Sequence, residues 1–373
     1  MANWKVSKEV VEVFPHKNAD NLEVILAGKS QFVSQKGLYT TGDVVIFAPE
    51  KSILTNSAML ESFGKYLSGA QKNRVKPAQL RGELSEGITW PTDEASLLVF
   101  GEENAAKIKA APLGEDISEL MGITKYEPPI PSNLQGMLKG IHLSGTKRPT
   151  NVSIYNHDAY QFGAFANKYF TPDTLVRVTE KVHGSLVSYT AVFEDDALIQ
   201  EVVSSKGLLK QGIEILEDEV NTYWKGVKSS KLREAAVDVL NKYYEQTGEK
   251  SCIVNITGEV VPVQNGFSYG FTEPKVLVYS LTVNGVHIPY HNAVQSLKDV
   301  WVPVLFEGKL SDFNPYDFGD EKEHVSGKKL HITEGYVVSD ENLQVKFRNE
   351  DRPVYLKIIA PKYAKKSNGE EIN

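Results

Sequence analysis

Three prolines close together divide this chain into two β-rich parts. Pro128, Pro129 and Pro131 lie in the segment 127–133, and proline can continue neither a helix nor a central strand, because it lacks a backbone N–H and its φ angle is fixed. The segment is therefore expected to be an ordered linker. A chain of 373 residues is also long enough for two domains with separate hydrophobic cores. We expect an N-terminal domain at residues 1–126, a linker and the start of the second domain at 127–160, and the second domain at 161–373.

The N-terminal part alternates short β-rich runs with polar turns. The runs are VVEVF, LEVILAG, QFVSQ, DVVIFAP and GITWP, and the turn segments between them include PHKNADN, QKGLYTTGD and LRGELSEG. Runs rich in β-branched and aromatic residues, separated by Gly, Asn and Asp, are typical of strands joined by tight turns. Five such strands predict a small β-barrel.

The second part has the pattern of many strands interrupted by one clear helix. The expected strands are LVRVTEKV, SYTAVFE, LIQEVVSS, SCIVNITGEVVP, KVLVYSLTV, GYVVS, LQVKFR and VYLKII. The helix is expected to begin at an N-cap of Ser229 or Ser230 and to end at Gly248. Its apolar stripe consists of Leu232, Ala235, Ala236, Val239, Leu240 and Tyr243. This part is therefore predicted to be α+β, with largely antiparallel sheets and flanking helices.

The formal net charge of −7 argues against a protein whose whole surface binds nucleic acid. Any such surface must be local. Candidate basic stretches are Lys72, Arg74, Lys76 and Arg81, then Lys139, Lys147 and Arg148, and finally Lys357, Lys362, Lys365 and Lys366. Most charged stretches of this kind are simply solvated surface.

Several other classes of protein are disfavoured. No apolar run approaches the roughly 18 residues that span a bilayer, and the start MANWKVSKEV has neither the basic nor the apolar region of a secretion signal. The single cysteine, Cys252, excludes an intrachain disulfide, and its apolar surroundings indicate buried packing. The histidines show no metal-ligand spacing. We expect a cytoplasmic protein with no membrane association and no obligate protein partner.

The segment Glu180-Lys181-Val182-His183-Gly184-Ser185 directly follows the predicted strand LVRVT. A lysine at the end of a buried strand, followed by a glycine that lets the backbone turn sharply, presents an amine on a rigid support. The tetrapeptide KxxG alone is a weak signal. Its weight comes from the motifs that follow in order, which are SSKG at 204–207, GEVV at 258–261, the strand VLVYSL, EGYVV at 334–338 and LKI at 356–358.

This order of motifs over residues 175–363 resembles the covalent nucleotidyltransferase superfamily of ligases and capping enzymes, whose catalytic domain has an ATP-grasp-like ligase fold. A second resemblance narrows the family. PHKNADNLE at 15–23, GDVV at 42–45, Pro49 and LRGELSEG at 80–87 are similar to the N-terminal OB module of one RNA ligase family.

The order of the two parts matters, because DNA ligases and capping enzymes carry an OB module after the catalytic domain. Only ten residues follow Tyr363, so we expect no OB module there. The resemblance therefore implies an ATP-dependent RNA ligase with an N-terminal OB-type barrel and a C-terminal adenylyltransferase domain.

By this resemblance, Lys181 attacks the α-phosphorus of ATP and carries the AMP. The step needs a free amine, whereas a lysine with a reference pKa of about 10.4 is almost entirely protonated near neutral pH. Nearby cations, namely Mg²⁺ and the ammonium of Lys357, would favour the free amine, and Lys357 would also bind the α-phosphate. Glu259 and Glu334 would bind Mg²⁺, or Mn²⁺ in its place, directly or through water, or else contact the ribose.

Further nucleotide-binding positions are carried over in the same way. Glu180 resembles the carboxylate that accepts from the adenine amine, and Tyr279 resembles the aromatic residue that stacks on adenine. Lys206 resembles the cation at the ribose or phosphates, and Gly184 completes the motif around the reactive lysine.

Two positions depart from the family pattern or leave it ambiguous. Lys346 in VKFRN and Lys357 in LKIIAPKY both resemble the lysine of the last motif, and the continuation KxxxPxY favours Lys357. His183 stands where the superfamily often has Asp, which removes one carboxylate near the metal.

The implied reaction has three steps. Lys181 takes AMP from ATP with loss of pyrophosphate, the AMP moves to a 5′-phosphate, and a 3′-OH displaces it to form a phosphodiester, at RNA ends or at nicks in a duplex. Such an enzyme would serve RNA repair. Three alternatives stay open, namely a DNA ligase, a capping-type guanylyltransferase, and a non-enzymatic RNA- or tRNA-binding OB protein with a decayed ligase domain.

Overall fold

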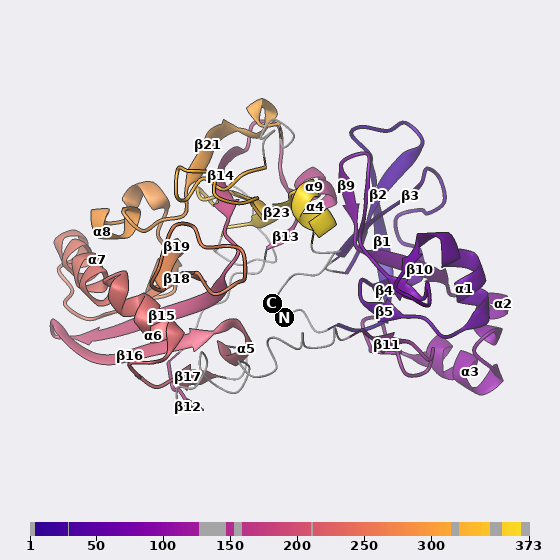
Figure 1. The fold of residues 1–373 in the computed structure, drawn as a ribbon, viewed down its shortest axis with the longest axis horizontal. Helices are drawn as coiled ribbons and strands as arrows, with labels where there is room; N and C mark the ends of the chain where they lie inside the picture. The colour runs from indigo at the N-terminus through magenta and orange to yellow at the C-terminus, as the bar shows by residue number, and fades with distance from the viewer. Residues whose placement is uncertain are drawn as a thin grey trace. The chain divides into compact units, whose positions relative to one another are not determined.

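The computed structural model describes residues 4–28, 30–126, 147–152, 159–209, 212–314, 321–343 and 353–366. The chain forms two compact units (Figure 1). The first comprises residues 1–129, 160–168 and 364–371, and the second comprises 130–159, 169–363 and 372–373. Residues 161–168 thus group with the N-terminal unit, whereas the sequence boundaries assign them to the second domain.

The first unit contains a five-stranded antiparallel sheet with the order β10-β4-β1-β2-β3. The strands are β1 (Ser7–Pro15), β2 (Leu22–Ala27), β3 (Ser30–Gln35), β4 (Val44–Pro49) and β10 (Gly87–Pro91). All five strands predicted for this part are therefore present. Val11, Ile25, Phe32, Val45 and Phe47 form a buried core on this sheet.

A smaller antiparallel sheet in the same unit has the order β11-β5-β7-β6. Its short strands are β5 (Ser52–Ile53), β6 (Leu67–Ser68), β7 (Arg74–Val75) and β11 (Thr124–Lys125). The unit also contains the hairpin β8 (Ala78–Leu80) and β9 (Glu83–Ser85), the helices α1 (Ser57–Phe63), α2 (Glu94–Leu98) and α3 (Glu102–Ala110), and the 3-10 turn Gly64–Tyr66. A second core, which includes Leu54, Met59, Trp90, Ile108 and Met121, joins these elements.

Buried polar contacts attach residues 160–168 to the first unit. This segment contains β13 (Tyr160–Gln161) and most of α4 (Phe162–Tyr169). The backbone N–H of Ala164 donates to the side-chain oxygen of Gln31 at 3.2 Å, and the Gln161 amide donates to Glu86 at 2.6 Å. Because Gln31 is almost fully buried, loss of the Ala164 N–H would leave the side-chain oxygen of Gln31 without a hydrogen bond and without water to replace it.

The second unit is built on a seven-stranded antiparallel sheet with the order β12-β17-β16-β15-β18-β19-β20. The strands are β12 (Lys147–Pro149), β15 (Ser185–Glu194), β16 (Ala197–Ser205), β17 (Ile213–Ile215), β18 (Cys252–Val261), β19 (Lys275–Val283) and β20 (Val286–His287). Helices α6 (Thr222–Ser229) and α7 (Leu232–Thr247) bury Val227, Leu232 and Leu240 in one core with Tyr189 and Ile256 of this sheet. Burial raises the pKa of the Cys252 thiol to about 11, which confirms its packing role.

Helix α7 confirms the predicted apolar stripe and its end at Gly248, but the predicted N-cap is wrong. The N-cap position is Lys231, in the left-handed region with φ of 53°. Ser230 instead accepts the N–H of Val276 at 2.7 Å, and Ser229 donates to the carbonyl of Pro274. Both serines are taken up by contacts with the segment at the start of β19, which local sequence does not reveal. Asn221 caps α6 by accepting from Tyr223 and Trp224.

A second antiparallel sheet of this unit places β23, β22, β14 and β21 side by side in that order. The strands are β14 (Leu175–Lys181), β21 (Val304–Lys309), β22 (Gly335–Ser339) and β23 (Tyr355–Ile359). The remaining elements are α5 (Lys206–Leu209), α8 (Gln295–Lys298), α9 (Pro361–Lys366) and the 3-10 turns Tyr290–Asn292 and Leu310–Asp312. The predicted strand LQVKFR lies mostly outside the described residues. The described residues are thus α+β and rich in antiparallel sheet, as predicted.

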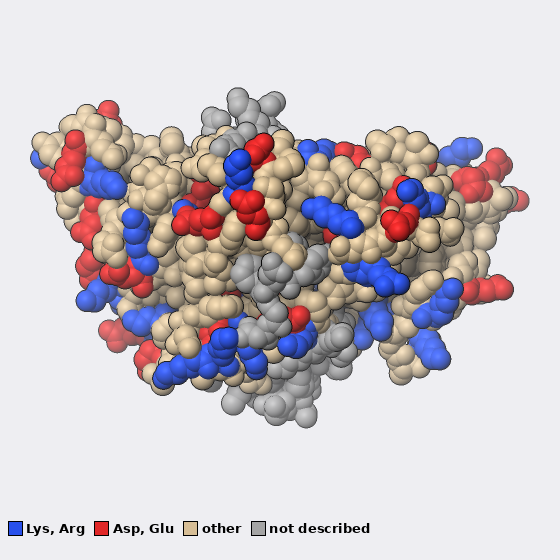
Figure 2. All heavy atoms as spheres, turned by 90° about the horizontal axis from the view of Figure 1, so that it is seen from above, with Lys and Arg blue, Asp and Glu red and all other residues tan. Residues whose placement is uncertain are grey.

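Charged side chains of both signs are interspersed over the face shown in Figure 2. This distribution agrees with the sequence argument that a nucleic-acid surface has to be local. No helix among the described residues is both long enough and apolar enough to cross a membrane.

Candidate active site

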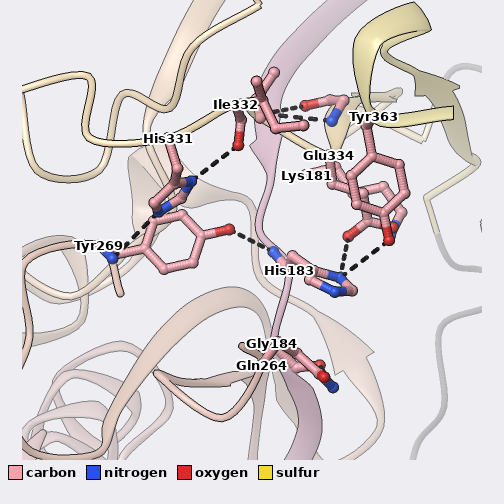
Figure 3. Close-up of polar contacts among 11 residues, drawn as sticks. Lys181, His183, Gly184, Gln264, Tyr269, His331, Ile332, Glu334 and Tyr363 are labelled. Atoms are coloured by element: carbon pink, nitrogen blue, oxygen red, sulfur yellow. Dashed lines mark hydrogen bonds and ion pairs between the residues drawn. The ribbon is translucent and has the colours of Figure 1, made fainter. Parts of the chain in front are cut away.

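Lys181 is the last residue of β14, and its ammonium forms an ion pair with Glu334, the residue directly before β22 (Figure 3). The pairing of β14 with β22 sets Lys181 opposite Gly335, so the two side chains meet at neighbouring strand ends. The Lys181 side chain is 22% exposed and that of Glu334 is 3% exposed. The amine is therefore accessible, while the carboxylate that holds it is not.

His183 holds the other oxygen of Glu334. Its Nδ1 lies 3.1 Å from Glu334 Oε2, so the imidazole N–H donates to the carboxylate. The ring is buried, with edge-to-face contacts to Phe267 at 4.5 Å and Tyr363 at 5.3 Å between ring centroids. Its Nε2 has no hydrogen-bond partner among the described residues. His183 thus holds Glu334 in one orientation.

The carboxylate of Glu334 is ionised despite its burial. Burial raises the pKa of such a group, but the Lys181 ammonium and the His183 hydrogen bond outweigh this effect and hold the pKa of Glu334 below its ordinary value. A buried charge that keeps two partners costs much less than an unpaired one. The three side chains therefore form one electrostatic unit.

Two glycines allow the backbones to come close around this unit. A Cβ on Gly184 would lie 2.5 Å from the carbonyl oxygen of Val260, and a Cβ on Gly335 would lie 1.9 Å from that of Ile358. Gly184 was expected to permit a sharp turn. Its φ is not positive, and the reason for glycine here is space beside β18.

Residues 182–184 connect β14 of one sheet to β15 of the other. Tyr269 holds this connection, because its phenol oxygen accepts the backbone N–H of His183 at 2.7 Å. The Tyr269 backbone has a φ of 51°, which is rare for a bulky residue, and its own N–H donates to His331 Nε2 at 3.3 Å. His331 Nδ1 in turn donates to the carbonyl of Ile332 at 2.9 Å (Figure 3).

Burial raises the pKa of the Tyr269 phenol, and the hydrogen bond from the His183 N–H opposes this effect only in part, so the hydroxyl stays protonated. The charges of Glu180, Glu334 and Glu259 make smaller contributions that raise this pKa further. Tyr269 and His331 were not predicted, since neither lies in a motif and only the following Gly270 marks the turn.

Glu180, next to Lys181 on β14, is buried in a different environment. Its Oε2 accepts the backbone N–H of His324 at 2.7 Å, while Oε1 has no hydrogen-bond partner among the described residues. Burial, with a smaller contribution from the charge of Glu323, raises the pKa of Glu180 to about 7. Glu180 can therefore be either a neutral acid or a carboxylate near neutral pH.

Glu259 lies on β18 and is half-buried. It pairs with Leu186 of β15, so the two side chains share one face of the sheet. Ser185, whose Oγ lies 2.7 Å from the Tyr223 hydroxyl, pairs with Val260 and points to the opposite face. Burial raises the pKa of Tyr223, and the charge of Glu259 has a smaller effect in the same direction.

Lys357 shares a sheet face with Lys181. Directly opposed residues of an antiparallel sheet point to the same side, and the register opposes Thr179, Val337 and Lys357 in one row. The adjacent row on that face contains Lys181, Gly335 and Ile359, because the side-chain period of a strand is two residues. Lys181 and Lys357 therefore lie on one face of the sheet. The strand between theirs, β22, has Gly335 opposite Lys181.

Of the remaining predicted residues, Tyr279 and Lys206 lie on other elements of the second unit, and Lys346 is not among the described residues. Tyr279 is half-buried on β19 and packs against the core of the second unit. Lys206 is exposed at the start of α5.

No group of three or more His, Cys, Asp or Glu side chains among the described residues is arranged to enclose a metal ion. Glu259 and Glu334 offer the hard oxygen donors that Mg²⁺ prefers, but the two oxygens of Glu334 already contact Lys181 and His183. These residues fit a hydrated ion, which Glu334 would reach through water.

The model of the RNA ligase family matches residues 174–359, about half of the chain. The structure of an RNA ligase from Naegleria gruberi with pyrophosphate is similar at 19% identity, with a TM-score of 0.59, over 99% of this chain and 100% of that one. A variant of that ligase with ATP and Mn matches at 20% identity and a TM-score of 0.58, over 98% and 99% of the two chains. Another variant, with AMP and Mn, matches at 18% identity and a TM-score of 0.57, over 99% and 100%. No curated protein matched the sequence.

The family match and the fold define a nucleotidyltransferase of the ligase class. The chain belongs to the RNA ligase family and is an RNA ligase enzyme.

Proposed function

We propose that this enzyme uses ATP to join a 3′-OH and a 5′-phosphate of RNA through AMP bound covalently to Lys181, and that its substrate is a nick in a duplex. The observation that carries the proposal is the fixed Lys181 amine, ion-paired to buried Glu334 and on the same sheet face as Lys357. A nucleophile on a rigid strand, with a second cation on the same sheet face, suits in-line attack on a phosphate.

Release of a proton from Lys181 is the first requirement. The ion pair with Glu334 stabilises the ammonium form, so the amine becomes nucleophilic only when this pair is weakened. The positive charges of a divalent ion bound with the nucleotide and of Lys357 would favour the neutral amine, and the proton of Lys181 would pass to solvent. His183 would keep Glu334 in place meanwhile, because it holds the oxygen that Lys181 does not use.

The divalent ion would be Mg²⁺ or Mn²⁺, held by Glu259 and Glu334 with water completing its coordination. When bound, the ion supplies charge neutralisation at the phosphates. Lys357 would bind the α-phosphate and stabilise the charge that develops there.

The base and sugar of ATP would contact residues around this centre. Glu180 Oε1, buried and without a partner among the described residues, would accept from the adenine amine. Tyr279 would stack on the ring and Lys206 would meet the ribose or the phosphates. Gly184 allows close approach of the backbone, and Lys346 is the alternative to Lys357 in the last motif.

Residues 1–126, which make up most of the first unit, are proposed to be an OB module, followed by a linker at 127–160 and an adenylyltransferase domain at 161–373. The five-stranded sheet of the first unit supplies the strands that such a barrel requires. The module would add a surface along the RNA, so that removing it would impair nick sealing more than transfer of AMP to Lys181. The biological setting would be RNA repair in the cytoplasm.

The decisive experiment incubates the purified protein with α-phosphate-labelled ATP and Mg²⁺ and then separates it under denaturing conditions. We expect a labelled band that is lost in Lys181→Ala and kept in Lys225→Ala, an exposed lysine on α6. Absence of label on protein freed of bound AMP, with ATP or GTP, would reject the proposal in favour of an RNA-binding role.

Nicked duplexes then identify the acceptor. We expect sealing when the 3′-OH strand is RNA and little sealing when it is DNA, and the reverse preference would indicate a DNA ligase.

A further inference from the structure

The small sheet β11-β5-β7-β6 of the first unit has one buried face and one face open to solvent. Leu67, Val75 and Ser52 point inward and are at most 8% exposed. The next row, which pairs Ser68 with Arg74 and Arg74 with Ile53, must point outward because side chains alternate along a strand. Arg74 therefore lies on the outer face.

This outer face is basic in a chain whose net charge is negative. Residues 62–82 contain five Lys or Arg and no Asp or Glu, whereas the whole chain carries −7. Lys65, Lys72 and Lys76, from or beside β6 and β7, are exposed. A local positive field of this kind attracts a polyanion even when the protein as a whole is acidic.

Aromatic rings accompany the charges. Tyr66 is 58% exposed, and the ammonium of Lys65 lies 4.9 Å from the centre of its ring. The Arg74 guanidinium lies 4.1 Å from the centre of the Tyr126 ring. Proteins bind single-stranded nucleic acids with aromatic rings beside Lys and Arg, because bases stack on the rings and phosphates contact the cations.

We propose that this outer face, defined by Lys65, Tyr66, Lys72, Arg74, Lys76 and Tyr126, binds a single-stranded segment of RNA. A base stacks on Tyr66, and Lys72 and Lys76 contact the phosphates. Single-stranded RNA is favoured over a duplex because a base can reach Tyr66 only when it is unpaired. The inference extends the proposed RNA ligase function, since it assigns this surface of the first unit to a single-stranded part of the RNA substrate outside the nicked duplex.

The test measures binding of the full-length protein, without ATP, to a fluorescent single-stranded RNA and to a blunt RNA duplex of the same length. We expect Tyr66→Ala to weaken single-strand binding about tenfold and Tyr66→Phe to restore it, since one stacked base is lost and regained. Tyr244→Ala removes a tyrosine that is 45% exposed on α7 and is the matched control. Duplex binding should change little in all three.

The charges are tested separately. The double variant Lys72→Glu with Lys76→Glu should weaken binding and reduce the slope of log K against log salt by about 1.4, which corresponds to two phosphate contacts on a single strand. The control, Lys36→Glu with Lys109→Glu, changes the net charge equally at exposed positions of the same unit. Equal effects of the two double variants, or no effect of Tyr66→Ala, would overturn the proposal.

Transfer of AMP to the protein, measured on the same variants, separates this inference from the proposed function. We expect the labelled band at normal strength in every one of them, since none changes the second unit's reactive centre. If the variants lose RNA binding and neither they nor the native protein take up AMP, the ATP-dependent mechanism is rejected and the RNA-binding surface is supported. Normal labelling with unchanged RNA binding would reject the surface and keep the mechanism.

Discussion

The phenol oxygen of Tyr269 accepts the backbone N–H of His183 at 2.7 Å, so a residue from the loop after β18 fixes the segment that follows Lys181. Both groups are buried, and no water can replace the bond without rearrangement. The position of Lys181, the proposed nucleophile, thus depends on a tyrosine that makes no ion pair with it.

Tyr269→Phe tests this dependence. Removal of the oxygen leaves a buried N–H unsatisfied, which costs about 1–3 kcal/mol of stability, and it loosens a segment whose position matters for attack. We expect transfer of AMP to the protein to slow at least about tenfold, measured as the single-turnover rate of labelling. Tyr243→Phe, which removes a phenol bonded to Glu249 at 2.9 Å on α7, is the control. Equal rates in the two variants would show that the bond does not position Lys181.

Glu334→Gln tests the ion pair with Lys181. The substitution keeps the shape of the side chain but removes the charge that pairs with Lys181, in a site where Glu334 is fully enclosed. Loss of the charge makes release of the Lys181 proton easier, but it also removes the carboxylate that positions Lys181 and, in the proposed mechanism, holds the divalent ion, so we expect labelling to fall by about 100-fold or more. Glu201→Gln breaks the pair with Arg233 in the same unit and should label normally. A labelled, active Glu334→Gln variant would remove this carboxylate from the mechanism.

Glu180 makes stability depend on pH. The pKa of this carboxyl is about 4.5 in the unfolded chain and about 7 in the folded protein. Between these two pH values the folded state binds more protons than the unfolded state, so the free energy of unfolding falls as pH rises. The fall amounts to about 3 kcal/mol for a shift of this size. Glu180→Gln has no proton to lose, so its stability relative to the native protein should rise from pH 5 to pH 8. Urea denaturation at both values measures this, with exposed Glu245→Gln as the control. A constant difference would show that Glu180 ionises normally.

Gly184→Ala tests the close approach of β15 to β18. A methyl group 2.5 Å from the carbonyl oxygen of Val260 forces the strands apart, and we expect a loss of more than about 2 kcal/mol in unfolding free energy. Gly207→Ala has open space around the added carbon and should be neutral within about 0.5 kcal/mol. Thermal unfolding of the two variants compares them directly, and equal midpoints would mean that the strands yield without cost.

Sequence periodicity revealed the strands of both units well, because alternating burial leaves a local signal. The order of motifs also located Lys181 and Glu334, which the structure joins across 153 positions. The partners that complete the centre were not visible. Tyr269 reaches His183 across 86 positions, and His331 reaches Tyr269 across 62, through loop geometry that has no period.

Competition between local and distant partners explains the other departures. Ser229 and Ser230 have the chemistry of helix caps, but the start of β19 takes both. Gln161 and Ala164 follow the proline-rich segment in sequence, yet Gln31 and Glu86 of the first unit bind them. A domain boundary inferred from sequence composition does not take account of hydrogen bonds between residues far apart in the sequence.

The three residues between Lys181 and Ser185 also limit how far the nucleophile can travel. Four residue steps of fully extended chain span at most about 14 Å, so the end of β14 can never move further than this from the start of β15. A lysine on a long flexible segment could carry a bound group between two distant sites. The segment after Lys181 is too short for this, so in the proposed reaction the RNA ends have to come to the AMP on Lys181.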